Sequence, residues 1–236
     1  MNDYLNSLQN SNSVFQNKET RILDLISRWF LIICCVFAFC TLFISTVYEK
    51  APVSGPSMQN TFNKYGDGLK DTVIINVFMK YSYGDIIVID RSNDVNVQNF
   101  HIKRVVGLPG DKINFVETNG RYMLQRNGKL IQENYVKSQA AIKSTYDHFH
   151  DILKVKEDQQ KYFDNDGNYV VPKNCVFVLG DNRGVSEDSS MNGAYSMDTV
   201  VGYVQYVVPS GVSIFGYFIQ NIFRLPLENA KLYSNV

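Results

Sequence analysis

The stretch HIKRVVGLPGD at residues 101–111 decides how the middle of this chain folds. Its apolar, β-branched residues favour a strand, and the glycines and proline of its second half end that strand in a turn. Lys103 lies among apolar neighbours on this predicted strand, and alternation sends Arg104 to the opposite face. Burial disfavours an ammonium and lowers its pKa, which makes Lys103 a candidate general base. An isolated Lys-Arg pair is more often solvated on an edge strand, so other segments must decide whether Lys103 is a buried base or a surface residue.

A second stretch, SGPSMQNT at residues 54–61, supplies a candidate nucleophile. Gly and Pro mark a tight turn, which can present the Ser57 hydroxyl with its own amide beside it. Acyl transfer needs both an attacking oxygen and donors for the oxyanion, although most serines in such contexts are only turn residues. Two of the three histidines lie in the polar stretch at residues 147–151, which does not resemble a catalytic triad. Lys103 is therefore the better candidate base, with His101 as the alternative.

Four motifs occur in an order and spacing that resemble those of type I signal peptidases. They are GPSM at residues 55–58, GDIIVI at 84–89, KRVVGLPGD at 103–111 and GDNRGVSEDS at 180–189. The resemblance covers roughly residues 53–207, although the middle of that range carries few matching residues. It implies a serine endopeptidase that removes N-terminal signal peptides from secreted preproteins, with no cofactor and no metal.

The resemblance also implies roles for single residues. Ser57 matches the nucleophile, and its backbone N–H is expected to be one oxyanion donor. Lys103 matches the general base, and Ser186 matches the serine that hydrogen-bonds and orients the lysine. The polar framework that braces such sites matches at three further positions, Asp181, Arg183 and Asp188.

Substrate recognition is implied by the same carry-over. Met58, Ile102 and Val53 are expected to line shallow apolar pockets for the substrate side chains at −1 and −3. Such pockets suit the Ala-x-Ala pattern that ends signal peptides, and they exclude larger residues by steric clash. We therefore expect preproteins that carry signal peptides as substrates.

The chain departs from the family pattern at three positions. Gly55 stands where some members carry a serine that donates to the oxyanion, so a second donor is absent or comes from elsewhere. Asn60 replaces the usual proline after the nucleophile. Ser190 replaces an arginine, which removes an expected partner of Asp188. None of these changes touches Ser57, and we do not expect an inactive enzyme.

Residues 29–48, WFLIICCVFAFCTLFISTVY, carry no charge. A helix of this length spans about 30 Å, the hydrocarbon thickness of a bilayer, which predicts a single transmembrane helix. A cleaved signal peptide has a shorter apolar core and a small-residue site after it, and the remaining alternative is a buried helix of a soluble domain. The flanking positive charges set only a slight orientation bias. The resemblance implies a bacterial-type cell membrane, a cytoplasmic N-terminus and an extracytoplasmic catalytic part.

Composition bounds the rest of the chain. It has 236 residues and a formal net charge of zero, which provides no electrostatic case for nucleic acid binding. The pattern predicts a mainly β fold with an antiparallel sheet, and the family inserts a second β region. Only Cys175 lies outside the apolar segment, so no intrachain disulfide is expected in the outer domain. The expected parts are a cytoplasmic segment at 1–28, the transmembrane helix at 29–48, the catalytic β domain at 51–117 and 173–212, the inserted region at 118–172, and a C-terminal amphipathic segment and tail at 213–236.

Two features of the inserted region suggest metal sites. His148 and His150 would share one face of a strand, which makes a metal site conceivable, but two histidines without a third ligand are usually surface residues. The sequence DNDG at residues 164–167 lacks the later ligands of a calcium loop, and a hairpin turn is the favoured interpretation.

Three functions compete on this sequence. The first is a membrane-anchored signal peptidase that meets its preproteins near the protein export machinery and contacts membrane lipid. The second is a related Ser/Lys peptidase dedicated to one secretion or conjugation substrate. The third is a non-enzymatic membrane-bound β module, which the combination of Ser57, Lys103 and Ser186 disfavours.

Overall fold

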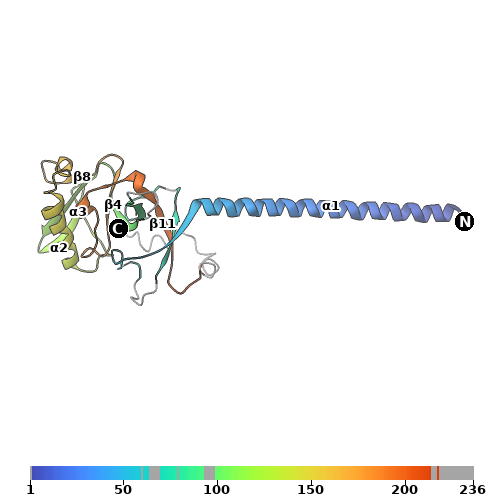
Figure 1. The fold of residues 1–236 in the computed structure, drawn as a ribbon, viewed down its shortest axis with the longest axis horizontal. Coiled ribbons are helices and arrows are strands. Elements are labelled where there is room, and N and C mark those ends of the chain that lie inside the picture. Colours follow the sequence, from blue (N-terminus) through green and yellow to red (C-terminus); the bar gives the residue numbers. More distant parts are fainter. Residues whose placement is uncertain are drawn as a thin grey trace. The chain divides into compact units, whose positions relative to one another are not determined.

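The computed structural model describes residues 2–59, 61–63, 70–78, 80–92, 99–213 and 217. The chain separates into two compact units, Met1–Val47 and Tyr48–Val236. The first unit is formed by one helix, α1 (Asn2–Val47), drawn in blue in Figure 1. The C-terminal amphipathic segment expected at 213–236 lies almost entirely outside the described residues.

The second half of α1 is apolar enough to cross a membrane. In Thr20–Val47 the most apolar 18 residues have a mean hydropathy of 2.7, and none of them is buried. This exposure differs from that of a core helix in a soluble domain, whose apolar face would be covered. The three cysteines Cys34, Cys35 and Cys40 are exposed on this helix and are free thiols.

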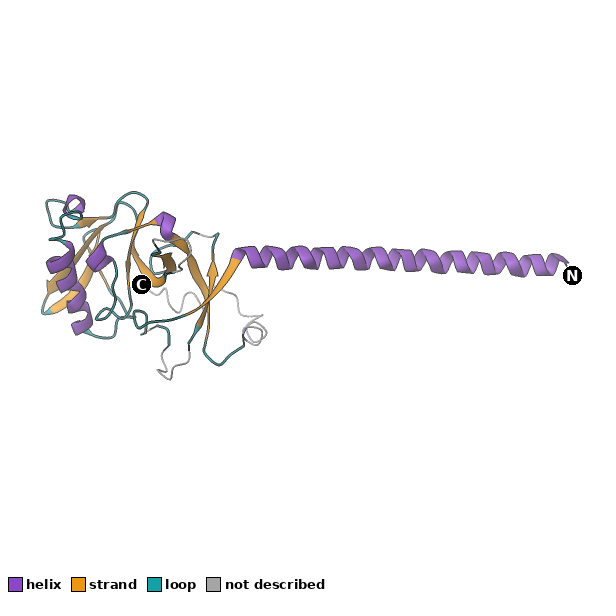
Figure 2. Ribbon diagram, viewed as in Figure 1, coloured by secondary structure: helices purple, strands orange, loops and turns teal. Residues whose placement is uncertain are grey.

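The second unit is built on a seven-stranded sheet in the order β1-β2-β11-β3-β4-β9-β10, in which every recorded pair is antiparallel (Figure 2). This architecture confirms the mainly β, antiparallel prediction. The strands are β1 (Tyr48–Pro52), β2 (Thr72–Asn76), β3 (Ile86–Asp90), β4 (Phe100–Gly107), β9 (Cys175–Leu179), β10 (Tyr195–Ser196) and β11 (Val200–Val208).

A smaller sheet of four strands runs in the order β7-β6-β5-β8. Its strands are β5 (Lys112–Thr118), β6 (Arg121–Arg126), β7 (Lys129–Ile131) and β8 (Tyr169–Val170). Two Asn-Gly turns join the first three strands, and all four turn residues have positive φ, between 52° and 77°. Two-residue hairpin turns with positive φ at both positions match the twist of the strands, and Asn-Gly is a pair that adopts this conformation readily.

Helical segments flank the second sheet and include α2 (Gln139–Asp147), a π-helical turn (His148–Leu153) and a 3-10 turn (Gln160–Tyr162). The predicted strand that would carry His148 and His150 on one face is therefore wrong. Ser138 caps α2 by accepting a hydrogen bond from the Ala141 N–H, and this cap starts the helix. The alternation of two histidines over three residues gives no sign of it. Phe149 and Leu153, one helical turn apart, are buried against the core.

A hairpin turn at residues 164–167 is confirmed. The Asp164 N–H donates to the carbonyl of Asn168, with an N–O distance of 2.9 Å, and Gly167 has a φ of +78°. The remaining short helices are α3 (Ser189–Asn192) and a 3-10 turn (Met197–Thr199).

The two sheets share one hydrophobic core. Val106, Phe177 and Leu179 of the larger sheet pack in one cluster with Ile113 and Phe115 of the smaller sheet. Burying these side chains together stabilises both sheets at roughly 1.5–3 kcal/mol for each large side chain. The second sheet is therefore held firmly against strand β9, which leads into the GDNR loop.

Candidate active site

Ser57 lies in the turn that follows β1, where the chain leaves the larger sheet. Gly55 has a φ of +85°, a conformation that side chains other than glycine rarely adopt. The Gln59 N–H donates to the carbonyl of Pro56 at 3.1 Å, and the Phe62 N–H donates to that of Met58 at 2.8 Å. These bonds leave Ser57 half-buried at the surface. Among the described residues no acceptor is recorded for its own N–H, and a backbone N–H beside the hydroxyl is the type of donor that an oxyanion needs.

Lys103 is buried in strand β4, with a relative exposure of only 3%. Its Nζ donates to Ser186 Oγ at 3.0 Å. Burial lowers the pKa of Lys103, and the carboxylate of Asp188 is the main opposing influence. Among the described residues no hydrogen bond joins Lys103 Nζ to Ser57 Oγ. The structure therefore pairs Lys103 directly with Ser186. The Ser57 turn is connected to this pair through the loop that carries Gly180 and Asn182.

Gly180 joins the serine turn to the lysine. A Cβ at this position would stand 2.7 Å from the carbonyl oxygen of Ser57 and would overlap Ser186 Oγ, so only glycine fits. The Asn182 N–H also donates to the Ser57 carbonyl at 2.9 Å, and Asn182 Nδ2 donates to the carbonyl of Pro56 at 3.0 Å. The turn that carries Ser57 and the side chain of Ser186, which binds Lys103, thus both pack closely around Gly180.

Asp181 connects all four sequence motifs. Arg104 Nε and Nη2 donate to its two carboxylate oxygens at 2.8 and 2.7 Å, while Arg104 Nη1 donates to the carbonyl of Gly84 at 2.6 Å. Thr61 Oγ1 donates to Asp181 Oδ2, and the Asp181 N–H donates to Met58 Sδ at 3.3 Å. Asp181 and Arg104 are both fully buried. Arg104 therefore braces the loop from one face of β4, while Lys103 faces Ser186 from the other.

Asp188 accepts hydrogen bonds from the loop itself. Its Oδ2 accepts from the Gly180 N–H at 2.9 Å, and its Oδ1 accepts from the N–H and Oγ of Ser190 at 3.0 and 2.8 Å. We expected the replacement of arginine by Ser190 to cost Asp188 a partner. In the structure Ser190 itself supplies two donors to Asp188, which is the N-cap residue of α3.

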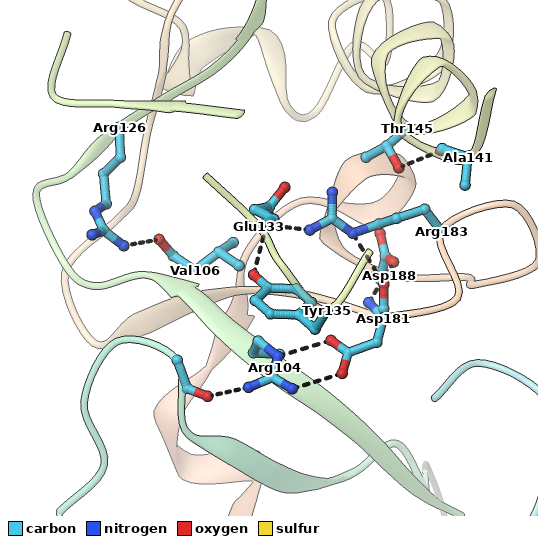
Figure 3. A network of polar contacts seen from close by, with 12 residues as sticks. Arg104, Val106, Arg126, Glu133, Tyr135, Ala141, Thr145, Asp181, Arg183 and Asp188 are labelled. Carbon is cyan, nitrogen blue, oxygen red and sulfur yellow. Dashed lines mark hydrogen bonds and ion pairs between the residues drawn. The ribbon is translucent and has the colours of Figure 1, made fainter. Parts of the chain in front are cut away.

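Arg183 pairs with a residue that the motifs do not contain, Glu133 on the segment after β7. Arg183 Nη2 donates to Glu133 Oε1, and Tyr135 Oη donates to the same oxygen at 2.6 Å. The Arg104 guanidinium lies 4.1 Å from the centroid of the Tyr135 ring (Figure 3). Glu133 is separated from Arg183 by 50 positions, and no local pattern marks it as a partner.

The expected substrate-contacting residues gather in one hydrophobic cluster. Val53 and Met58 are 2% and 1% exposed, and Ile102 packs against them while remaining half-buried. A cavity of about 480 Å³ lies elsewhere, against β6 and α2, and none of these three residues lines it. Asn60, the departure two positions after Met58 in the sequence, lies outside the described residues.

His101, the alternative base, has Asn99 as its recorded side-chain partner. Its Nε2 lies 3.0 Å from Asn99 Oδ1. Burial, followed by the positive charges of Arg91 and Lys103, lowers the pKa of His101. In the described residues no three His, Cys, Asp or Glu side chains gather as metal ligands, and His150 Nε2 lies 2.9 Å from the carbonyl of Phe115.

The chain resembles known signal peptidases in sequence. The family model described as signal peptidase, peptidase S26, matches residues 26–209. The signal peptidase I P of Bacillus subtilis subsp. natto is 30% identical over 205 residues, which cover 81% of this chain and 91% of that protein. The signal peptidase IB of Staphylococcus aureus strain COL is 32% identical over 187 residues, covering 77% and 88%. A crystal structure of a signal peptidase I from Enterococcus faecalis V583 matches with a TM-score of 0.34 and 24% identity, covering 53% of this chain and 97% of that one.

Proposed function

This chain belongs to the signal peptidase family, peptidase S26, and we propose that it cleaves signal peptides from preproteins with Ser57 as nucleophile and Lys103 as general base. Membership of the family makes the chain a serine peptidase and implies signal-peptide removal as its reaction. One observation carries the assignment of the base: a buried lysine with a lowered pKa donates to Ser186 beside the turn of Ser57.

The proposed reaction begins with neutral Lys103, which takes the proton of Ser57 Oγ as that oxygen attacks the carbonyl carbon of the −1 residue. The Ser57 N–H stabilises the oxyanion, and the Lys103 ammonium then gives its proton to the departing amine. Water, deprotonated by Lys103, hydrolyses the acyl-enzyme and frees Ser57. The first transfer requires Ser57 Oγ to come within hydrogen-bond reach of Lys103 Nζ, and such contacts often form only with substrate bound.

Substrate choice rests, in this proposal, on the cluster of Val53, Met58 and Ile102. The half-buried Ile102 offers an apolar surface, and the two buried residues form the wall behind it. A closely packed apolar wall accepts alanine and rejects bulky side chains, because enlarging the site would disturb a dense core.

Membrane anchoring by α1 is the second part of the proposal. Thr20–Val47 is long and apolar enough to cross a bilayer. A signal peptide also carries an apolar core, so an anchored enzyme meets its substrate at the same membrane surface. Cleavage follows export, which places the N-terminus in the cytoplasm and the β domain outside, near the export machinery and in contact with lipid.

The test uses the full chain in detergent or liposomes with several unrelated preproteins that carry Ala-x-Ala sites. We expect a single cut after the −1 alanine, located by mass spectrometry of both products, and no cut when that alanine is replaced by leucine. A precursor altered at a position outside the signal peptide serves as the matched control. If all of these preproteins stay intact and only one secretion or conjugation substrate is cleaved, the result would instead favour a dedicated Ser/Lys processing peptidase.

Removing the charge of Arg91 and removing that of Glu187 should shift the pH dependence of cleavage in opposite directions. Neutral Lys103 is the active form, so kcat/KM should rise with pH through the pKa of Lys103, which burial lowers below its ordinary value. Arg91 lowers this pKa further and Glu187 raises it. Arg91→Gln should therefore move the midpoint to higher pH, and Glu187→Gln should move it to lower pH. Profiles of kcat/KM between pH 6 and 10 would measure both shifts, and midpoints that move together would contradict Lys103 as the base.

A further inference from the structure

We propose that Glu133 is a positioning residue for this reaction, acting through Arg183 on the loop that carries Gly180 and Ser186. The inference rests on the function proposed above and adds a residue from the segment that follows the second sheet, a part of the chain that supplies neither the nucleophile nor the base. Glu133 follows β7, and its carboxylate faces both Arg183 and the Tyr135 hydroxyl (Figure 3).

The Glu133–Arg183 pair is one of two deeply buried ion pairs recorded in the described residues. The side chains are 2% and 0% exposed. Burial opposes the charge of Arg183, and Glu133 is the largest influence that raises its pKa. Burial and then the Glu133 carboxylate raise the pKa of Tyr135 well above its ordinary value, so its hydroxyl stays protonated and donates to Glu133. A buried guanidinium that loses its carboxylate is strongly destabilised where it stands.

Arg183 transmits this constraint to Gly180. Its Nε donates to the carbonyl of Gly180 at 3.1 Å, and the Gly180 N–H donates to Asp188 at 2.9 Å. Both polar backbone groups of this glycine are thereby held. Because the space where a Gly180 side chain would begin is filled by the Ser57 carbonyl oxygen and Ser186 Oγ, a shift of the Gly180 backbone would displace both the nucleophile turn and the partner of Lys103.

Tyr135 braces the neighbouring residue of the same loop. Its ring lies under the Arg104 guanidinium, which holds Asp181 through two hydrogen bonds. Glu133 and Tyr135 therefore restrain Gly180 and Asp181, two consecutive loop residues, through two different arginines. Catalytic geometry is sensitive to displacements of about 1 Å, which can cost about 100-fold in rate.

The test measures kcat and KM for an Ala-x-Ala preprotein with full-length Glu133→Gln in detergent. Glu117→Gln, which changes an exposed glutamate of β5, is the matched control, and Ser57→Ala is the inactive reference. We expect Glu133→Gln to lower kcat by about 10- to 100-fold with KM within about threefold of wild type. The pH midpoint set by Lys103 should stay unchanged, because the loss is geometric.

The route through Arg183 is tested with a double variant. In an Arg183→Met background, Glu133→Gln should lower kcat no further, because residues that act through one contact are not additive. Equal kcat for Glu133→Gln and Glu117→Gln, or a loss fully additive with Arg183→Met, would overturn the inference. If Glu133→Gln does not fold, Tyr135→Phe replaces it, and an unchanged kcat in that variant overturns the inference as well. Full activity of Ser57→Ala would instead refute the proposed function itself.

Discussion

Lys103→Met is expected to lower the rate of preprotein cleavage by about 10⁴-fold or more while leaving the protein at least as stable as wild type. The loss follows because no other group takes the Ser57 proton, and removing one member of a nucleophile–base pair costs about as much as removing both. Stability should not fall, because the Lys103 side chain is only 3% exposed and methionine has a similar length. Methionine also carries no charge, so its burial has no cost of removing a charge from water. Single-turnover cleavage at pH 8, with thermal unfolding of the same preparation, measures both effects.

His101→Ala provides the control for that result. His101 lies two positions before Lys103 on the same strand, but its Nε2 is directed to Asn99 Oδ1. We expect its loss to change the cleavage rate by less than about threefold, and the double variant Ser57→Ala/Lys103→Met should be no worse than either single variant. Cleavage by Lys103→Met near the wild-type rate, together with a large loss in His101→Ala, would assign the base to His101.

Asp181→Ala is expected to lower the free energy of unfolding by about 3–5 kcal/mol. The substitution leaves the guanidinium of Arg104 fully buried without its carboxylate, and it removes the acceptor of Thr61 Oγ1. The cost is dominated by the unpaired buried charge rather than by the lost attraction. Denaturant unfolding of the full chain in detergent measures this loss, and the same variant should be almost inactive because the loop of Gly180 loses its anchor.

A compensating substitution distinguishes this explanation from a general loss of packing. Arg104→Met in the Asp181→Ala background removes the stranded charge and should recover part of the lost stability. Asp158→Ala, at an exposed position, should change the free energy of unfolding by no more than about 0.5 kcal/mol. A cost below about 1 kcal/mol for Asp181→Ala would contradict a buried ion pair at this position.

Local signals predicted the framework of this fold well. The strand expected within HIKRVVGLPGD is β4 (Phe100–Gly107), and the hairpin turn expected at residues 164–167 has Gly167 at a φ of +78°. Turn geometry and strand alternation depend on neighbouring residues alone, and these can be read from the chain. The strand predicted for His148 and His150 was wrong because a short alternating run fits a strand or a helix equally well. The N-cap at Ser138 and the burial of Phe149 favour the helical conformation instead.

Taken alone, the sequence determined the apolar helix, the antiparallel β class and, through its four motifs, the family to which the chain belongs. Only the tertiary structure decided that Glu133 neutralises Arg183 and that the Tyr135 ring packs against the Arg104 guanidinium. The physical reason is that motif residues follow one another in the chain, whereas the partner of a buried charge is chosen by proximity in space. Burial makes such a partner necessary, but the fold alone determines which residue, tens of positions away, provides it.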